Sequence, residues 1–430
     1  MTKSIIDFLK NNFQFYVFIL VAIFLPVTKK YLPLVMSLWV LSGLIQIKKI
    51  NLSNYKNLLI LLFPFLYFIL HIIGLLYTNN LKSGFFDLEV KLSIVFIPLI
   101  TLFISQKVIQ KQNQILQLFV ISNFIISLVC LFFALKNSLV YNDLGNLIFE
   151  PSVWSDTKNV GIFKMINLRY SHFSYSYLSF IHHPSYYSMY ITFSIVILIY
   201  FIKINKQKTW INFSLIIYFS VYIWLLASRA AYLIYFILLI GLILYLIKKY
   251  KKYLVLFAGI IAIGIAAVIL LSNKQLNRNF KETYKILHKN VHLNEKSDIR
   301  LWLWKSGLGI YKNNLIYGIG TGDIDLSLDK KFNEYNLKIA DEHNYNTHNQ
   351  YLDVAVKLGT IGLVSLLLWM FYPIYLAIKV KYYLLILLIL IVSINLIFEN
   401  MLNTIAGTSF IVFFYSLLVP VLTIKEKELN

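Results

Sequence analysis

The sequence predicts an all-α polytopic membrane protein with about twelve transmembrane helices and a large helical extracytoplasmic loop late in the chain. Three observations predict this class. The 430 residues are 59% hydrophobic and only 14% charged, too few charges to cover a soluble fold of this size. Runs of about 17–22 apolar residues recur, and each can cross a hydrocarbon core of about 30 Å as a helix. The lysines cluster between these runs, a pattern typical of membrane loops rather than of a nucleic-acid site.

Twelve apolar runs are predicted to span the membrane, although the tight first pair and the short fourth run also allow ten or eleven spans. The first run is followed by many others, so we expect an uncleaved span rather than a secretory signal. Two long polar segments follow the fifth and ninth spans, so both lie on the same side: 136–183 and 272–350. The predicted spans are 13–28, 31–47, 57–77, 91–105, 114–135, 184–203, 209–227, 230–247, 253–271, 351–376, 382–398 and 405–423.

The distribution of basic residues predicts the orientation. With a cytoplasmic N-terminus, the inside loops hold many lysines and the opposite short loops hold few basic residues. The positive-inside rule therefore places both long polar segments outside the cytoplasm. The inside residues are Lys48, Lys49, Lys56, Lys107, Lys111, Lys203, Lys206, Lys208, Lys248, Lys249, Lys251, Lys252, Lys379 and Lys381. The opposite residues are Lys29, Lys30, Lys82, Lys91 and Arg229.

The chain divides into three predicted regions. Residues 1–271 hold nine spans, 272–350 form the extracytoplasmic helical loop, and 351–430 hold the last three spans. Within the loop, short helices are predicted at 281–289 and 297–313, the second with Ser297 at its N-terminus. The single cysteine, Cys130, lies inside an apolar run, so no disulfide can form within one chain.

All four arginines fall on the predicted outer face: Arg169, Arg229, Arg278 and Arg300. Because the rigid guanidinium fork binds phosphate oxygens in pairs, this asymmetry favours an anionic substrate on that face. Arg229 and Arg300 are the main candidates, with Arg169 and Arg278 as possible supporting residues. The alternative is chance in a lysine-rich chain.

Two of these arginines have structural alternatives. Arg229 lies between two spans with almost no loop, where a charge needs a partner or a wet cavity, or else reaches the membrane surface. Arg300 lies beside Trp302 and Trp304 on an amphipathic segment, which suggests a helix along the membrane surface. The tryptophans can anchor that helix or stack on sugar rings, and they are possible supporting residues of the site.

His348, the candidate catalytic residue, and Asn349, a possible supporting residue, stand where the long outer loop meets the next span. A histidine there can accept a proton near neutral pH, or it can simply cap the helix. Asp353 and Lys357 are four residues apart and can pair, while Gly359 and Gly362 would allow a neighbouring helix to approach closely.

Metal and cofactor binding are not predicted. The "HH" at 182–183 and "HNYNTH" at 343–348 supply ligand types, but no HExxH is present and no Cys/His pair has zinc spacing. The glycine-rich "YGIGTGD" at 317–323 does not follow a strand and open a helix, so we expect a tight turn rather than a dinucleotide site.

Three segments together resemble the O-antigen ligase/polymerase superfamily of bacterial membrane proteins, most densely over about 220–370. They are "ASRAAYLIYFILLIGL", "DIRLWLWKSGLGIYKNNLIYGIGTGD" and "HNQYLDVAVKLGTIGLV", in the family's order and spacing. "HHPSYYSMYI" and "FENMLNTIAGTSFIVFF" match more weakly. The family's usual proline before the glycine turn is replaced here by Ile316–Tyr317.

The resemblance implies a metal-independent, inverting glycosyltransferase similar to the type C enzymes. It would transfer a glycan from undecaprenyl diphosphate to an acceptor hydroxyl, favoured here as a lipid A core sugar. The site would face the periplasm from the bacterial inner membrane, in lipopolysaccharide biosynthesis. By the same resemblance, Arg229 and Arg300 would hold the diphosphate and His348 would deprotonate or orient the hydroxyl.

Other functions share this architecture. An O-antigen or exopolysaccharide polymerase and a protein O-oligosaccharyl ligase differ from the favoured ligase only in the acceptor. A lipid-linked glycan transporter is less favoured, because we find no repeated halves and the candidate charges lie at the outer edge. The partners expected are the lipid-linked glycan, a glycolipid or glycan acceptor and the bilayer, with no nucleic acid.

Overall fold

The computed structural model describes residues 2–47, 58–153, 171–204, 209–250 and 299–428. The chain forms two compact units. Unit 1 consists of Met1–Asn123, Val196–Ile204 and Ile299–Asn430, and unit 2 of Phe124–Ile195 and Asn205–Asp298.

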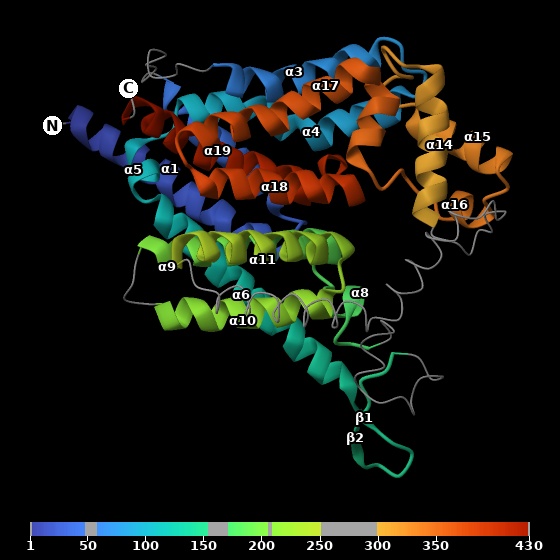
Figure 1. The fold of residues 1–430 in the computed structure, drawn as a ribbon, viewed down its shortest axis with the longest axis horizontal. Helices are drawn as coiled ribbons and strands as arrows, with labels where there is room; N and C mark the ends of the chain where they lie inside the picture. Colours follow the sequence, from blue (N-terminus) through green and yellow to red (C-terminus); the bar gives the residue numbers. More distant parts are fainter. Residues whose placement is uncertain (1, 48–57, 154–170, 205–208, 251–298, 429–430) are drawn as a thin grey trace. The chain divides into compact units, whose positions relative to one another are not determined.

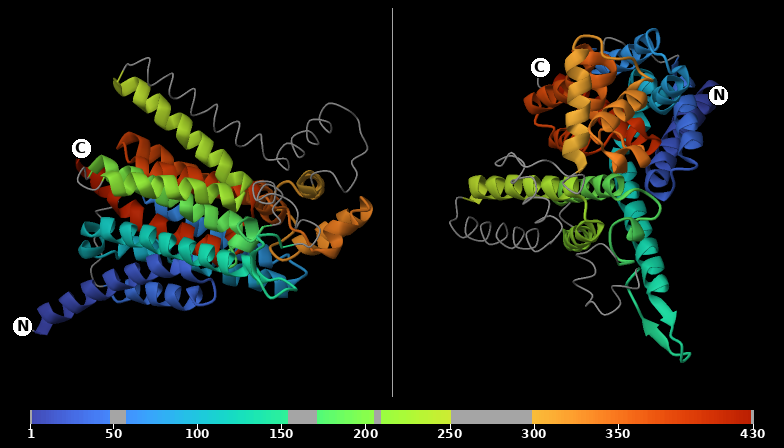
Figure 2. Two further views of the ribbon diagram at one scale, coloured as in Figure 1. Left: turned by 90° about the horizontal axis from the view of Figure 1, so that it is seen from below. Right: turned by 90° about the vertical axis from the view of Figure 1, so that its right-hand side faces the viewer.

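Unit 1 is a bundle of apolar helices with a group of polar helices at one end. Figures 1 and 2 show α3, α4 and α17–α19 running alongside one another, with α14 crossing their ends at a steep angle. The bundle is packed around buried aromatic rings, among them Trp39, Trp369 and Tyr415. Its helices are α1 (Thr2–Val27), α2 (Leu32–Leu44), α3 (Leu59–Leu75), α4 (Leu81–Leu102), α5 (Gln106–Gln110), α14 (Ile299–Asn313), α15 (Ile324–Glu334), α16 (Lys338–Glu342), α17 (Gln350–Lys379), α18 (Tyr383–Phe398), the 3₁₀ turn η5 (Met401–Asn403) and α19 (Ile405–Glu428).

Unit 2 contains α8 (Tyr175–Leu178), α10 (Thr209–Leu226) and α11 (Arg229–Tyr250), and it shares α6 (Gln112–Ser138) and α9 (Pro184–Ile204) with unit 1. A two-stranded antiparallel hairpin follows α6, formed by β1 (Leu139–Tyr141) and β2 (Leu147–Phe149). The Tyr235 hydroxyl donates a 2.9 Å hydrogen bond to Ser220 Oγ, which links α11 to α10.

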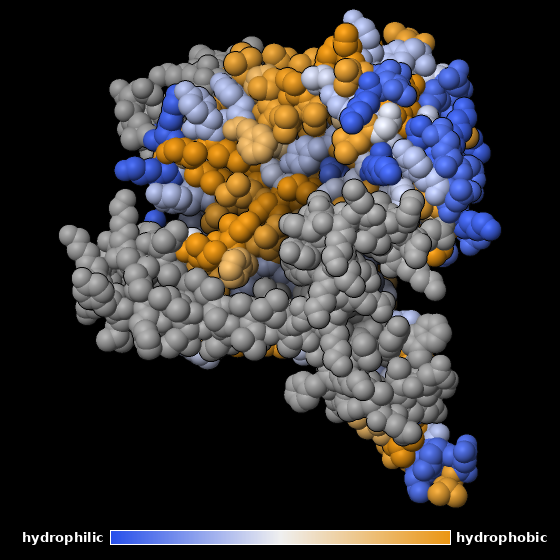
Figure 3. All heavy atoms as spheres, turned by 45° about the vertical axis from the view of Figure 1, so that its right-hand side comes forward, coloured by the Kyte–Doolittle hydropathy of each residue, from blue (hydrophilic) through white to orange (hydrophobic). Residues whose placement is uncertain are grey.

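The observed helices agree with an all-α membrane protein. Eleven of the twelve predicted spans coincide with helices, and the remaining span, 253–271, lies outside the described residues. Five described helices are long and apolar enough to cross a membrane: α6, α9, α10, α17 and α19. On the face of unit 1 drawn in Figure 3, apolar side chains cover the middle of the bundle and hydrophilic ones gather toward its ends. The number of crossing helices and their orientation stay predictions.

The fourth helix begins earlier than predicted. The sequence placed Lys91 in a short loop before a span at 91–105, but α4 starts at Leu81 and Lys91 is fully buried within it. The prediction was wrong because it treated charges as ends of spans. Here the charge of Lys91 is paired inside the bundle, 2.6 Å from Asp87 one helical turn earlier.

The helix predicted at 297–313 is α14, which packs against α17 and α15, and its Trp302, Leu303 and Ile310 are buried. Its predicted N-terminal residue Ser297 and the helix predicted at 281–289 lie outside the described residues. The following turn, 314–323, joins α14 to α15.

Helix α17 is broken at Gly359, where φ is 64° and ψ is −161°. This backbone region is essentially restricted to glycine. The break frees the carbonyls of Val356 and Lys357, which accept 3.0 Å hydrogen bonds from the backbone N–H groups of Ile319 and Gly320. A Cβ on Gly359 would lie 2.1 Å from the Ile316 carbonyl oxygen. The close approach predicted at Gly359 therefore involves a turn, and the prediction of a neighbouring helix was wrong.

Candidate active site

Glu399 brings together two of the residues predicted from the sequence. Arg300, in the first turn of α14, donates a 3.0 Å hydrogen bond to Glu399 Oε1. His348 Nδ1 lies 3.0 Å from Glu399 Oε2. Glu399 follows the last residue of α18, and its side chain is only 7% exposed, whereas those of Arg300 and His348 are 22% and 27% exposed. One carboxylate therefore bridges the guanidinium and the imidazole.

The chain holds His348 in a constrained backbone conformation, with φ at +44°. The backbone N–H of His348 donates a 2.8 Å hydrogen bond to Asn346 Oδ1. The imidazole ring packs edge to face against the Tyr345 ring, with ring centroids 5.9 Å apart. Because an ionised carboxylate only accepts hydrogen bonds, the proton shared with Glu399 belongs to Nδ1, and in the neutral imidazole Nε2 is then the ring nitrogen with a free electron pair.

Asn349 has a structural part in this site. Its side-chain oxygen accepts a 3.1 Å hydrogen bond from Leu352 N–H, so it caps the N-terminus of α17. The cap fixes where the helix starts and thereby where His348 stands. The structure shows this helix cap, and a supporting role of Asn349 in the function stays a prediction.

The two tryptophans have different surroundings. Trp302 is buried beside Tyr335, with ring centroids 5.6 Å apart, and the Lys305 ammonium lies 4.7 Å from its ring centroid. Trp304 is partly exposed. Within the described residues, neither indole N–H has a hydrogen-bond partner.

Next to the Arg300–Glu399–His348 cluster, a network of buried polar side chains joins α17 to the segment after α18. Asn400 Nδ2 and Asn403 Nδ2 each donate a 3.1 Å hydrogen bond to the carboxylate of Asp353. The Asp353 carboxylate also pairs with Lys357 at 3.0 Å, as the spacing predicts. This network anchors the 399–403 segment and hence the position of Glu399.

The same network continues into α4. Lys357 Nζ lies 2.8 Å from Asp87 Oδ1, and Lys91 Nζ pairs with the same oxygen while donating a 2.9 Å hydrogen bond to Asn403 Oδ1. Buried charges are costly unless they are paired in this way. Sequence reasoning missed Asp87 as a partner, although its spacing of four from Lys91 on one helix was a legible signal.

Arg229 belongs to unit 2, where it is the first residue of α11. Only Ala227 and Ser228 separate it from α10, as expected, and Ala227 has φ at +50°. Arg229 is half-buried. Its convergence with Arg300 and His348 stays a prediction. Arg169 and Arg278 lie outside the described residues.

The predicted tight turn at 317–323 is present, and its last residue supports a neighbouring loop. Gly318 and Gly320 have φ at +72° and +105°. The carboxylate of Asp323 accepts hydrogen bonds of 2.9 Å from Asn79 N–H and 2.7 Å from Asn80 N–H. The turn thereby ties the start of α4 to that of α15.

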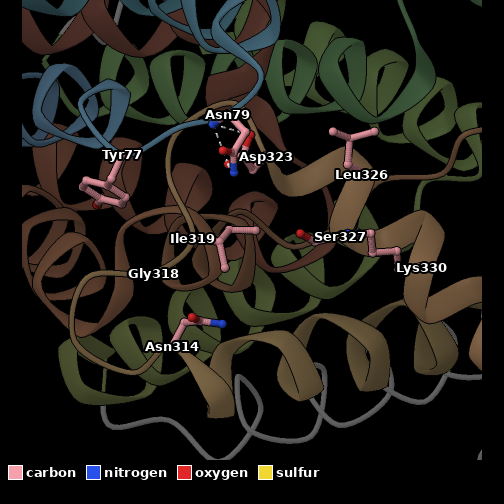
Figure 4. A pocket seen from close by; sticks show the side chains of 9 residues that line it. All are labelled: Tyr77, Asn79, Asn314, Gly318, Ile319, Asp323, Leu326, Ser327 and Lys330. Carbon is pink, nitrogen blue, oxygen red and sulfur yellow. Dashed lines mark hydrogen bonds between the residues drawn. The ribbon is translucent and has the colours of Figure 1, made fainter.

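A cavity of about 600 Å³ opens beside this turn, away from the Arg300–Glu399–His348 cluster. Figure 4 shows the residues around it, which come from the loop after α3, the 314–323 turn and α15. They are Tyr77, Asn79, Asn314, Gly318, Ile319, Asp323, Leu326, Ser327 and Lys330. Among the described residues, no group of three or more His, Cys, Asp or Glu side chains is placed to hold a metal ion.

The fold and the buried polar cluster define an all-α membrane protein with a polar site at one end of a helical bundle. Residues 213–367 match the O-antigen ligase family, which bears out the predicted resemblance to that superfamily. This stretch includes Arg229, Arg300 and His348. The match supports glycan transfer of the ligase or polymerase type.

A relative in Haemophilus influenzae, described only as an uncharacterized protein, is 30% identical over 195 residues. The aligned region covers 44% of this chain and 48% of the relative, so the chain spans about half the length of the curated relative it matches.

Proposed function

We propose that this protein transfers a glycan from undecaprenyl diphosphate to an acceptor hydroxyl at the outer face of the bacterial inner membrane. The observation that carries the proposal is the Glu399 carboxylate, which joins Arg300 to His348 at 3.0 Å on each side. The family match over residues 213–367 supports the same reaction type.

In this proposal, Arg300 and Arg229 bind the diphosphate. Guanidinium groups stabilise the negative charge that develops on a phosphate leaving group, without protonating it and without a metal ion. Arg300 also donates a hydrogen bond to Glu399, so the diphosphate shares this guanidinium with the carboxylate.

His348 serves as the general base. Its Nδ1–H donates to Glu399, which leaves Nε2 to accept the proton of the acceptor hydroxyl. The hydroxyl oxygen attacks the anomeric carbon, the bond from that carbon to the phosphate oxygen breaks, and the electron pair leaves with the diphosphate. Attack opposite the leaving group inverts the anomeric centre.

The favoured acceptor is a lipid A core sugar, which makes the reaction a step of lipopolysaccharide biosynthesis. A polymerase, which adds repeat units to a growing glycan, and a protein O-oligosaccharyl ligase are the alternatives. All three use the same donor chemistry, so the Arg300–Glu399–His348 cluster serves each of them equally.

A chromosomal deletion complemented with His348→Ala, Arg300→Ala or wild-type protein tests the proposal. We expect His348→Ala to lower glycan attachment at least about a hundredfold, since removing a general base costs about 10²–10⁴. Arg300→Ala should cost about 10²–10³, since it removes a group that stabilises the charge of the leaving diphosphate. His343→Ala is the matched control, because His343 lies in the same segment and, among the described residues, its ring contacts the Ile339 carbonyl and Tyr345 rather than Glu399.

Surface lipopolysaccharide and undecaprenyl-linked glycan are measured side by side, with protein amounts checked by immunoblot. Lost attachment with accumulated polymeric donor supports the ligase. Single attached repeats indicate a polymerase, and normal lipopolysaccharide with altered glycoproteins indicates a protein ligase. Near-normal transfer by both variants would overturn the mechanism, and retention of donor on the inner face would favour a transporter.

A further inference from the structure

The cavity in Figure 4 lies outside the proposed transfer chemistry. We infer that it is a saccharide-binding subsite, which holds a sugar of the glycan chain at a distance from the bond being formed. The inference rests on the proposed function and adds to it a place where a second part of the substrate binds.

The cavity presents hydrogen-bonding groups that the fold leaves unused. Among the described residues, no hydrogen bond or ion pair engages Ser327 Oγ or Lys330 Nζ. Asn314 uses its Nδ2 to donate to the Ile310 carbonyl at 3.1 Å, and its side-chain oxygen is left to accept. A hydroxyl, an ammonium and an amide oxygen match the donors and acceptors of sugar hydroxyls.

Apolar surface lies between these polar groups. Ile319 lines the cavity, and Leu326 is 50% exposed beside it. The Tyr77 ring is also exposed, and its hydroxyl donates a 2.6 Å hydrogen bond to the Tyr317 carbonyl, which fixes the ring. Because a sugar ring has C–H faces as well as hydroxyls, a cavity that mixes fixed apolar surface with polar groups suits it.

The walls of the cavity are held in place before any ligand arrives. Asp323 is buried, and its carboxylate binds the N–H groups of Asn79 and Asn80 and, at 3.1 Å, Asn79 Nδ2. These bonds fix the loop after α3 against the start of α15. A preformed site loses less conformational entropy when it binds a ligand than a mobile one does.

The cavity is too far from Arg300 to hold the reacting sugar itself. Arg300 lies in the first turn of α14, and Asn314 follows the last residue of that helix, 14 positions after Arg300. At 1.5 Å per helical residue this is about 20 Å. The sugar in the cavity therefore belongs to a more distant part of the donor or acceptor glycan.

The test compares Ser327→Ala/Lys330→Ala with Lys331→Ala in purified full-length protein. Lys331 is the adjacent lysine on α15, but it pairs with Glu334 and does not line the cavity. Two donors are used: undecaprenyl diphosphate with one sugar, and the full-length lipid-linked glycan extracted from host membranes. We expect the double variant to raise KM for the long donor about three- to tenfold, because it removes two hydrogen bonds. Its kcat and its KM for the one-sugar donor stay unchanged, as do all values for Lys331→Ala.

A second arm repeats the comparison with short and long acceptors at a fixed donor. A KM change confined to donor length or to acceptor length identifies which glycan occupies the cavity. Equal KM values for the double variant and wild-type protein in both arms would overturn the inference.

Direct binding separates this inference from the proposed function. Saturation-transfer NMR is recorded with the free oligosaccharide released from the donor by mild acid. Binding that is lost in the double variant supports the subsite even if wild-type protein transfers no glycan, which would contradict only the proposed function. Transfer by wild-type protein with equal oligosaccharide binding in both proteins would overturn the subsite and leave the function standing.

Discussion

At the scale of single residues, Glu399 organises the candidate active site. It has 7% of its side chain exposed and contacts both Arg300 and His348. Sequence reasoning identified the arginine and the histidine but missed the carboxylate between them. The available signal was the polar "EN" at 399–400, directly after an apolar span, where a charge needs a partner.

Glu399→Gln should lower kcat for glycan transfer about ten- to hundredfold. The change replaces a carboxylate by an amide, and hydrogen bonds to charged groups contribute about 1.5–3 kcal/mol. The glutamine amide can also donate to Nδ1 and favour the imidazole form whose Nε2 carries the proton and cannot act as a base. KM for the donor should not rise, because Arg300 becomes more available to the diphosphate.

The control for this prediction is Glu334→Gln, which makes the same chemical change on an exposed surface pair with Lys331. Steady-state kinetics on purified protein give kcat and KM separately. Unchanged kcat in Glu399→Gln would remove Glu399 from the mechanism and leave it a purely structural ion-pair partner.

At the scale of elements, the break in α17 determines how the 314–323 turn packs. The helix gives up its own hydrogen bonds around Gly359, and the turn between α14 and α15 takes them over. The backbone at Gly359 both adopts a conformation reserved for glycine and passes close to Ile316. A single residue thus joins α17 to the turn that borders the cavity.

Gly359→Ala should destabilise the protein by about 1–3 kcal/mol, the usual cost of a disallowed backbone conformation, and more where the clash with Ile316 cannot relax. The measurement is the thermal unfolding midpoint in detergent. Gly145→Ala is the matched control, because Gly145 also has positive φ, at 75°, but nothing lies within 4 Å of its added Cβ. Equal midpoints for the two variants would show that the close packing at Gly359 is unimportant.

At the scale of the whole molecule, the basic residues predict how the chain sits in its membrane. The net charge is +21, and the lysines concentrate in loops on one predicted side. Anionic cytoplasmic lipid attracts such loops, which would place α14–α16 and the candidate active site outside the cytoplasm.

Cysteine labelling tests this orientation. The chain has a single, buried cysteine, so Cys130→Ser provides a cysteine-free background. Lys338→Cys, on α16, should react with a membrane-impermeant maleimide in cells whose outer membrane has been permeabilised. Lys381→Cys, between α17 and α18, should react only after the inner membrane is opened. Both positions are exposed, so the reverse pattern would mean that the predicted orientation is inverted.

Hydrophobic length and the order of polar residues were enough to predict most helices and two members of the Arg300–Glu399–His348 cluster. These features can be predicted because a helix that crosses lipid requires a long apolar run. Arginines gathered on one side of the membrane, in turn, indicate an anionic ligand there. The start of α4 was misplaced because the sequence does not distinguish a buried, paired lysine such as Lys91 from a lysine in a loop.

The sequence alone predicted the membrane class, the resemblance to the O-antigen ligase family and the candidate residues Arg300 and His348, because each depends on residue type and local spacing. Tertiary structure decided what those residues contact. Glu399 lies 51 residues after His348 and 99 after Arg300, and Asp87 lies 270 before Lys357. Such partners meet only when the helices pack. A buried charge without an opposite partner is costly in free energy, so the packing that pairs the two is favoured whatever their separation along the chain.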